Sequence, residues 1–515
     1  LMLLFSLTFL VSITPIPRQY KLNNPDFIYL NKFEWKCISN GVSCLDHLTN
    51  MKQLYEKAFY PKGEPVQNQN GISDLIINVD STITPKSPLD CDESYSIEVA
   101  TNIQITAKSL FGVSRALSTL SQLISEAPGD EYVPGKYSIQ KCSVSDKPVY
   151  RHRQLMVDAS RHYLPLKTLK RQINALALTK MNVFHLHLID SQSSAFSPST
   201  SPADAFTKAA YQNGQHYQFN LVELTELVRY AASVGVFTML EFDMPGHASS
   251  WRLVSEAVVA NCPGAGYSSV NPQNPETFTL IRAFLVDLIK AFTDNGLAPM
   301  IHLGGDEVDH TCWNEDPEIL KYMRDNKITT NMLWQIFHNK VAQIIKQLNQ
   351  DTIKFYWQES YENSNNFENS VVHSWNDESV VLKAAQKNVN VIRSLGWYLD
   401  LNQPLEGRYA FQMSWMDFYA VDILKDIPPQ YQQYVLGGGP CMWGEKVHNG
   451  NIDEQIWPRA LAIAEILWSN PADRTITNDL KNRLSDSVCQ LLNIGVQTGA
   501  FRPYKPCPGA PGARW

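Results

Sequence analysis

The chain has 515 residues, a formal net charge of −7 at pH 7 and a sequence pI of about 6.0. This balance excludes a protein built mainly to bind nucleic acid, because such a surface needs clustered Lys and Arg side chains. Apolar residues make up 44% of the sequence, which is enough for a large soluble core, and the length allows two or three domains.

Residues 1–16 are apolar or small, and the first charged side chain is that of Arg18. Such a stretch is typical of the apolar part of a signal peptide, although no basic residue precedes it here. A buried N-terminal strand is the alternative, and both stay open. No later run of the sequence approaches the ~20 consecutive apolar residues of a membrane helix, so we expect no membrane span.

Residues 17–150 combine three strand-like apolar runs, at 75–79, 95–99 and 103–106, with one amphipathic helix over 110–124. Strands together with a helix predict a small α+β domain in this part of the chain.

From residue 151 the pattern changes to short apolar runs that alternate with amphipathic helices. The eight runs are 154–158, 182–188, 237–241, 300–303, 353–357, 371–374, 389–394 and 434–442. Repeated strand–helix units predict a parallel sheet. Eight of them predict an α/β fold of the (β/α)₈ TIM-barrel type over residues 151–515.

Active sites of such barrels form at the C-terminal ends of the strands. The predicted strand ends carry the polar or aromatic residues Arg161, Asp190, His247, Asp306, Glu307, Trp357, Trp375, Tyr398, Asp400, Trp443 and Glu445. Any one of them has a structural explanation, such as core packing or an ion pair. Their joint placement is typical of a site that binds sugars.

The Asp306-Glu307 pair follows two glycines at the end of the fourth predicted strand. Glycines let the backbone bend and leave room for a ligand. Cleavage of a glycosidic bond needs an acid that protonates the leaving oxygen, and a neighbouring carboxylate raises the pKa of such an acid by repulsion. The pair is therefore a candidate for this chemistry, with a loop of two solvated acids as the alternative.

Seven stretches of the sequence resemble the glycoside hydrolases of family 20, the β-N-acetylhexosaminidases, in particular the lysosomal-type, β-subunit-like members. They are RHRQLMVDASRHYLP (151–165), KMNVFHLHLIDSQ (180–192), EFDMPGHASSW (241–251), IHLGGDEVDHTCW (301–313), WYLDL (397–401), CMWGE (441–445) and WPRALAIAEILW (457–468). These stretches span the predicted barrel in order, and residues 17–150 resemble the N-terminal domain of the family.

The resemblance implies an exo-β-N-acetylhexosaminidase in which the acetamido oxygen of the substrate, not a protein side chain, attacks the anomeric carbon. Glu307 matches the general acid of the family, and Asp306 the residue that orients the acetamido N–H. Tyr398 matches the phenol that binds the acetamido oxygen, while His247 and Asp190 match a relay that supports the acid. No cofactor and no metal ion is implied.

The remaining strand-end residues match positions that hold the sugar. Trp357, Trp375 and Trp443 match an aromatic cage around the acetamido methyl group and the ring. Arg161 and Glu445 match the pair that binds the non-reducing hydroxyl groups, with a structural ion pair as the alternative. Asp400, followed by Leu401, resembles members that prefer neutral substrates, since an acid there would repel a charged sugar.

The cysteines and the family together suggest an exported protein. Nine cysteines predict disulfides and at least one free thiol. The resemblance implies the pairs Cys262–Cys312 and Cys489–Cys507, and we expect Cys44 to pair with Cys91, with Cys37 as a competitor, Cys441 as a free buried thiol and Cys142 without an obvious partner. We expect a secreted protein or one in the lumen of a lysosome or vacuole, although the sequence has no Asn-x-Ser/Thr site for N-linked sugars.

Three rival interpretations stay open. A metal-dependent hydrolase would use His185, His187, His302 and Asp306, although structural histidines explain these positions better. A retaining enzyme of the two-carboxylate type would use Glu359 or Glu445 as nucleophile. A non-catalytic sugar-binding protein on the same fold is the third alternative. For the family that the sequence resembles, the expected partner is a glycan or glycoconjugate with a terminal N-acetylhexosamine, and a homodimer stays an open alternative.

Overall fold

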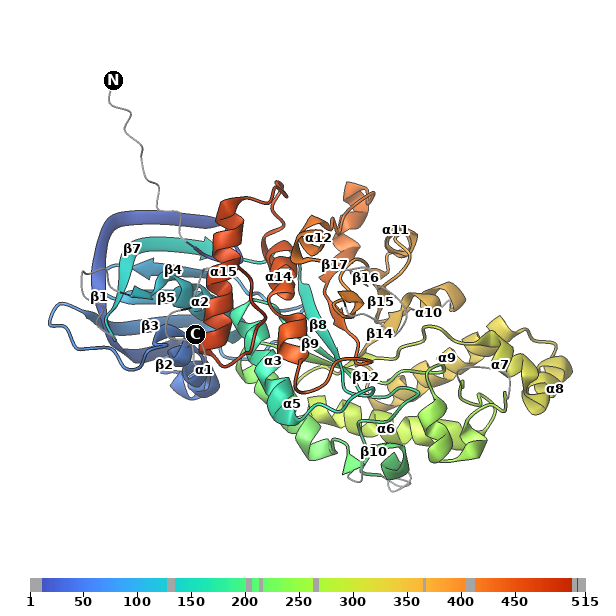
Figure 1. Cartoon of the computed structure of the whole chain (residues 1–515). Helices are drawn as coiled ribbons and strands as arrows, with labels where there is room; N and C mark the ends of the chain where they lie inside the picture. The colour runs from blue at the N-terminus through green and yellow to red at the C-terminus, as the bar shows by residue number, and fades with distance from the viewer. Residues whose placement is uncertain are drawn as a thin grey trace.

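The computed structural model describes residues 12–126, 135–200, 206–212, 216–262, 268–364, 367–402 and 413–502, together with residue 507. It has an N-terminal mixed sheet beside a closed barrel of parallel strands (Figure 1). Both the fold class and the N-terminal α+β unit predicted from the sequence are confirmed. The division of the chain at residues 150 and 151 stays a prediction.

The N-terminal sheet has seven strands in the order β2-β1-β3-β5-β4-β7-β6, and β1 also pairs with β7. The strands are β1 (Gln19–Ser39), β2 (Val42–Ser43), β3 (Ile72–Ser81), β4 (Tyr95–Val99), β5 (Ile103–Ser109), β6 (Ser125–Glu126) and β7 (Tyr137–Asp146), and the helices are α1 (Thr49–Phe59) and α2 (Leu110–Leu123). The three predicted strands lie within β3, β4 and β5. The long strand β1 and strand β7 were not predicted.

The barrel closes because β17 pairs with β8. Its strands are β8 (His152–Asp158), β9 (Val183–His187), β12 (Phe237–Glu241), β13 (Met300–His302), β14 (Ile353–Trp357), β15 (Ser370–Ser374), β16 (Asn390–Arg393) and an eighth strand in two pieces, β17 (Val435–Gly438) and β18 (Cys441–Met442). Each predicted run overlaps one of these strands, because buried parallel strands are apolar along most of their length.

Helices surround the barrel (Figure 1). They are α3 (Leu166–Leu178), α5 (Leu221–Ser233), α6 (Pro275–Thr293), α7 (His310–Glu315), α8 (Pro317–Asn326), α9 (Thr330–Leu348), α10 (Gln358–Asn363), α11 (Ser379–Gln386), α12 (Trp415–Ala420), α13 (Ile452–Ile456) and α14 (Arg459–Ser469). The last helix, α15 (Asn478–Asn493), lies beside the N-terminal sheet, and the short strands β10 (Tyr211–Gln212) and β11 (His216–Tyr217) pair antiparallel. Among the helices described here, none is both long and apolar enough to cross a membrane.

Glycines allow the eighth strand to close the barrel. A Cβ atom on Gly438 would lie 1.8 Å from the carbonyl oxygen of Arg393, and one on Gly439 would lie 1.9 Å from that of Gln154. Any larger residue at either position would therefore push the eighth strand away from one of its neighbours. This close approach explains the glycine run Gly437–Gly439.

The first described residues and helix α15 lie beside the helices of the N-terminal unit. Helix α15 packs against α1, α2 and α14. Residues 1–11 of the signal-peptide-like segment lie outside the described residues, but Ile13 is buried and the Ile16 N–H donates a hydrogen bond to Glu465 Oε2 at 3.0 Å. Residues 13–15 are thus buried in the fold, whereas the Ile16 side chain is exposed.

Two disulfides match the expected pairs, Cys262–Cys312 and Cys489–Cys507. The third corrects our expectation, because Cys44 bonds to Cys37 and Cys91 is free. A tight turn between β1 and β2 places the Cα atoms of Cys37 and Cys44 5.0 Å apart, and its two loop residues, Asn40 and Gly41, have positive φ angles. Cys142 and Cys441 are free and buried.

Buried charges join the N-terminal sheet to the barrel. Glu93 Oε1, just before β4, lies 2.7 Å from Arg115 Nε on α2 and 2.7 Å from Arg153 Nη2 on β8, and all three side chains are buried. Lys180 Nζ lies 3.0 Å from Asp146 Oδ2 in the same interface. These ion pairs fix the start of the barrel against the sheet.

We predict that Glu93→Ala lowers the free energy of unfolding by about 3–5 kcal/mol, because it leaves two buried guanidinium groups without their carboxylate. Urea unfolding followed by tryptophan fluorescence measures this loss. The matched control is Glu64→Ala, which breaks the exposed 2.8 Å pair with Lys32 and should leave the stability almost unchanged. Equal losses in the two variants would contradict the prediction.

Candidate active site

Four side chains that the sequence analysis singled out meet at the C-terminal end of the barrel. His247 Nδ1 lies 3.3 Å from Asp190 Oδ1, while His247 Nε2 lies 3.5 Å from Glu307 Oε2 and 3.8 Å from Asp306 Oδ2. Asp190, His247 and Asp306 are buried, whereas the Glu307 side chain is 56% exposed. The network therefore runs from the barrel interior to a carboxyl group that a ligand can reach.

The backbone of the turn after β13 is strained at Glu307, the residue that carries this exposed carboxyl group. Glu307 has a φ of +47°, a region that costs a residue with a side chain about 1–3 kcal/mol. We expected Gly304 and Gly305 to leave room for a ligand, but protein atoms fill that room. A Cβ on Gly304 would lie 1.7 Å from Asp243 Oδ1, and one on Gly305 2.0 Å from Ser360 Oγ.

Arg161 links several acids at the barrel mouth. Its Nη2 lies 2.8 Å from Asp190 Oδ2, and its Nη1 lies 2.8 Å from Asp158 Oδ2 and 3.6 Å from Glu445 Oε1. Its guanidinium carbon also lies 4.9 Å from the ring centroid of Trp443. The predicted pair of Arg161 and Glu445 is thus in contact, and the Glu445 side chain, which is half exposed, reaches solvent.

The predicted aromatic residues form one cluster beside the acids. Trp375, Tyr398 and Trp443 are partly buried and pack against Met156, Trp357 and Cys441 at the centre of the barrel. Trp357 is fully buried, and its indole N–H donates to Glu241 Oε1 at 2.8 Å. The indole N–H of Trp375 lies 3.1 and 3.0 Å from the two carboxyl oxygens of Glu359. The cluster provides an apolar wall with fixed ring orientations.

Burial and neighbouring charges shift the pKa values of the acids in opposite directions. Burial raises the pKa of Asp306, and the charges of Glu241 and Glu307 raise it further, although His247 opposes them. The hydrogen bond with His247 lowers the pKa of Glu307. Burial disfavours the charged form of His247, but Asp306, Asp190 and Glu307 outweigh burial and raise its pKa.

Two acids at the edge of the site change charge near neutral pH. Burial raises the pKa of Asp400 to about 7, and the charge of Glu445 adds to the effect. Burial and the charge of Asp306 raise the pKa of Glu359 to about 7 as well. Asp400 is therefore mostly neutral in acidic solution.

Three acids at the site received no role in the sequence analysis. Glu241 and Asp243 flank Phe242 in the EFDMPGH stretch, and Asp158 ends β8. The Gly305 N–H donates to Asp243 Oδ1 at 2.9 Å, and the Gly444 N–H donates to Asp158 Oδ2 at 2.9 Å. All three acids are the last residues of a strand or lie just beyond one, which is the signal that points to them.

The four residues of the metal-hydrolase alternative do not converge. His185, His187 and His302 all approach Glu241 below the mouth, at 2.8, 2.9 and 3.2 Å, whereas Asp306 contacts His247. The distances alone would let an ion bind among His185, Glu241 and His302. However, the Trp357 N–H already donates to Glu241 Oε1, and the Gly304 N–H donates to His302 Nδ1 at 3.1 Å.

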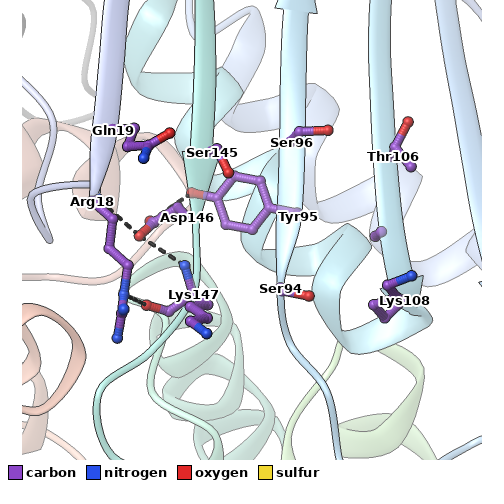
Figure 2. A pocket seen from close by; sticks show the side chains of 11 residues that line it. Arg18, Gln19, Ser94, Tyr95, Ser96, Thr106, Lys108, Ser145, Asp146 and Lys147 are labelled. Carbon is purple, nitrogen blue, oxygen red and sulfur yellow. Dashed lines mark hydrogen bonds between the residues drawn. The ribbon is translucent and has the colours of Figure 1, made fainter.

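A separate pocket of about 450 Å³ lies in the N-terminal sheet, at the ends of β1, β4, β5 and β7 (Figure 2). Its one buried acid is Asp146, which accepts hydrogen bonds from Tyr95, Lys180 and Trp468. The Arg18 side chain, also in Figure 2, donates to the carbonyl oxygen of Lys147. The pocket thus offers no counterpart to the acid pair at the barrel mouth.

Comparisons with known proteins agree with this geometry. The family described as "Glycosyl hydrolase family 20, catalytic domain" matches residues 150–471, and "beta-acetyl hexosaminidase like" matches residues 13–123. Beta-hexosaminidase subunit A1 of Dictyostelium discoideum is 31% identical over 87% of this chain and 83% of its own length. Beta-hexosaminidase subunit beta of Homo sapiens is 31% identical over 79% and 72%.

The crystal structure of a chitobiase from Flavobacterium johnsoniae has a TM-score of 0.76 and 25% identity, and the match covers 94% of this chain and 73% of that one. Because the catalytic-domain family spans most of the barrel and curated β-hexosaminidases are 31% identical over most of the chain, this protein is a glycosidase that belongs to glycoside hydrolase family 20.

Proposed function

We propose that this protein is an exo-β-N-acetylhexosaminidase that removes terminal, non-reducing β-linked GlcNAc or GalNAc with retention of configuration and with the help of the substrate's own amide. The observation that carries the proposal is the contact of His247 with both Asp306 and Glu307 beside an aromatic wall. One exposed acid next to one buried acid suits a reaction that needs a single proton donor.

In the first step of this mechanism the acetamido oxygen forms a bond to C1 while the bond from C1 to the leaving oxygen breaks. Glu307 gives its proton to that leaving oxygen. In the second step water attacks C1, Glu307 takes a proton from the water, and the ring formed by the acetamido oxygen opens. Tyr398 donates a hydrogen bond to the acetamido oxygen and holds it in attack geometry.

The charge of Asp306 explains how the intermediate would be stabilised. The acetamido nitrogen gains positive charge when its carbonyl oxygen attacks C1. Burial and like charges disfavour ionised Asp306 in the free site, as the raised pKa of Asp306 indicates. A positive partner beside the carboxylate relieves this penalty, so the interaction is stronger in the transition state than in the ground state.

Glu307 needs a proton when the substrate is bound, although contact with His247 lowers its pKa in the free protein. A sugar that covers the carboxyl group removes water from it, and loss of water raises the pKa of an acid. The lowered pKa in the free protein favours activity in acidic solution. That preference and the three disulfides suit a secreted protein or one in a lysosomal or vacuolar lumen.

The contacts of Glu359 and Glu445 argue against a protein nucleophile. Both oxygens of Glu359 lie within 3.1 Å of the Trp375 N–H. Glu445 extends toward solvent beside Arg161, where it is suited to bind sugar hydroxyl groups. A protein nucleophile needs a carboxyl group that is free to attack the anomeric carbon. Neither Glu359 nor Glu445 is placed as such a group.

The proposal is tested with a matched pair of aryl glycosides, one carrying the 2-acetamido group and one a 2-hydroxyl group. We expect turnover of the aryl N-acetyl-β-glucosaminide and at least about 1,000-fold less of the aryl β-glucoside, because intramolecular attack supplies an effective molarity far above that of any external group. Comparable turnover of the two substrates would overturn the mechanism.

We predict that Glu307→Gln lowers kcat for an aryl N-acetyl-β-glucosaminide by at least about 100-fold, because general acid catalysis contributes about 10²–10⁴-fold. Thermal unfolding should change little, since the side chain is exposed. The control is Glu315→Gln, which alters another exposed acid, the last residue of α7. A near-normal kcat for Glu307→Gln would refute the role of Glu307.

We predict that discrimination against a 6-sulfated aryl N-acetylglucosaminide grows with pH. The pKa of Asp400, raised to about 7, makes this carboxyl group neutral near pH 5 and charged near pH 8, where it repels a sulfate. Asp400→Asn should therefore raise the ratio of kcat/KM for the sulfated and neutral substrates about fivefold to tenfold at pH 8, and less than about twofold at pH 5. An equal gain at both pH values would contradict the prediction.

A further inference from the structure

Glu241, the last residue of β12, is fully buried, and polar side chains lie close to both of its carboxyl oxygens. Its Oε1 accepts the Trp357 N–H at 2.8 Å. Its Oε2 lies 2.9 Å from His187 Nδ1 and 2.8 Å from His185 Nε2. Glu241 therefore contacts both the aromatic wall and a histidine that leads toward the acids.

His187 lies between two buried carboxyl groups. Its Nδ1 faces Glu241 Oε2, and its Nε2 lies 3.2 Å from Asp190 Oδ2. A neutral imidazole has one N–H and one lone pair, so it would turn a lone pair toward one of the two carboxylates. While both carboxyl groups are ionised, both contacts are favourable only when both nitrogens carry protons. The two short distances therefore favour an imidazolium cation at His187.

The same arrangement repeats one step closer to the solvent. His247 has Asp190 Oδ1 at 3.3 Å from Nδ1 and Glu307 Oε2 at 3.5 Å from Nε2. Carboxyl groups and imidazole rings therefore alternate from Glu241 through His187, Asp190 and His247 to Glu307. This chain extends well below the four side chains that we assigned to the reaction.

Other charged or titratable groups face the inner end of the chain from the surrounding strands and turns. They are Asp158 and Arg161 from the β8 side, His185 on β9, Asp243 after β12, His302 and Asp306 on or after β13, and His373 on β15. Of these, Arg161 already pairs with Asp158 and Asp190. His185 contacts Glu241 but does not lie on the chain to Glu307.

We propose that Glu241 is a positioning residue that keeps His187 doubly protonated between two carboxylates and so fixes Asp190 and His247 behind the proton donor Glu307. The inference rests on the proposed function, in which Glu307 donates the proton. Glu241 needs no contact with the substrate for this role. A hydrogen bond from an imidazolium ring is about twice as strong as one from a neutral ring, so a charged His187 holds Asp190 more firmly.

The test is Glu241→Gln, which keeps the size of the side chain and an acceptor for the Trp357 N–H but removes the charge. His187 then faces one carboxylate, and its pKa falls toward the ordinary value near 6.5. Below this pKa the ring keeps both protons, and above it one is lost. We expect kcat to fall about tenfold at pH 8 but less than about twofold at pH 4.5, with KM changed by less than about threefold.

Three further variants separate this role from a merely structural one. His187→Gln has no ring to titrate, so its loss of kcat should be about tenfold at both pH values. The double variant should lose no more than His187→Gln alone, because both changes interrupt the same chain. His185→Gln is the matched control: it lies on the same strand and contacts the same oxygen, and its kcat should stay within about twofold of the parent.

The inference is overturned if the loss in Glu241→Gln does not change with pH, if the two single losses multiply in the double variant, or if His185→Gln loses as much as His187→Gln. Circular dichroism checks that each variant folds, and His187→Gln still tests the chain if Glu241→Gln does not. Failure of the proposed function would appear elsewhere, as near-normal turnover by Glu307→Gln. If the inference alone fails, Glu307→Gln remains inactive.

Discussion

The site depends on the balance of charge among carboxyl groups that the barrel buries together. Five of them crowd the C-terminal half of the barrel: Asp158, Asp190, Glu241, Asp243 and Asp306. The cations in contact with them are Arg161, His187 and His247. A buried charge without a partner is costly, so a carboxyl group without its own cation tends to hold a proton. Burial raises the pKa values of Asp243 and Asp306, neighbouring acids raise them further, and His247 offsets this only in part.

This balance is maintained by a rigid backbone. The Asp243 carboxyl group fills the space beside Gly304, where a Cβ atom would collide with it, and accepts the Gly305 N–H. His247 and Glu307 both have φ angles near +50°, which a residue with a side chain adopts only when its surroundings enforce it. Strain of this kind is stored where a site must be organised before its ligand arrives. The glycines of the turn therefore serve the packing of Asp243 and Ser360, whereas the Glu307 side chain is exposed.

The sequence predicted the barrel well because each of its strands is buried on both faces and stands out as an apolar run. It predicted the N-terminal sheet less well. The segment Asn23-Asn24-Pro25-Asp26 is typical of a turn, yet it lies inside β1, where register shifts after Leu22 and Asn24 absorb it within the pairing with β7. The pairing of Cys37 with Cys44 depends on a two-residue turn, which sequence spacing alone does not establish.

For the site, the sequence could identify the residues at strand ends but not the contacts among them. We considered His185 and His187 as metal ligands because their spacing along the strand is the same for metal-binding histidines and for structural histidines. The parallel register of β9 and β12 brings Glu241 to them, and what argues against a metal site is that Glu241 Oε1 already accepts the Trp357 N–H. The same limit applies to Asp400, whose pKa depends on burial that the sequence does not reveal.

The parallel register also gives the N-terminal sheet a part in the site. Asn182, just before β9, donates to Glu93 Oε2 at 3.1 Å, and Arg153 on β8 pairs with the same carboxyl group. These contacts lie at the start of two strands whose other ends carry Asp158 and His187. Because a shift of one residue in a parallel pair would turn each side chain to the opposite face, a fixed start determines which side chains point into the barrel. The ion pairs between the sheet and the barrel therefore help to orient the charged side chains at the mouth. Those side chains lie about five residues further along each strand.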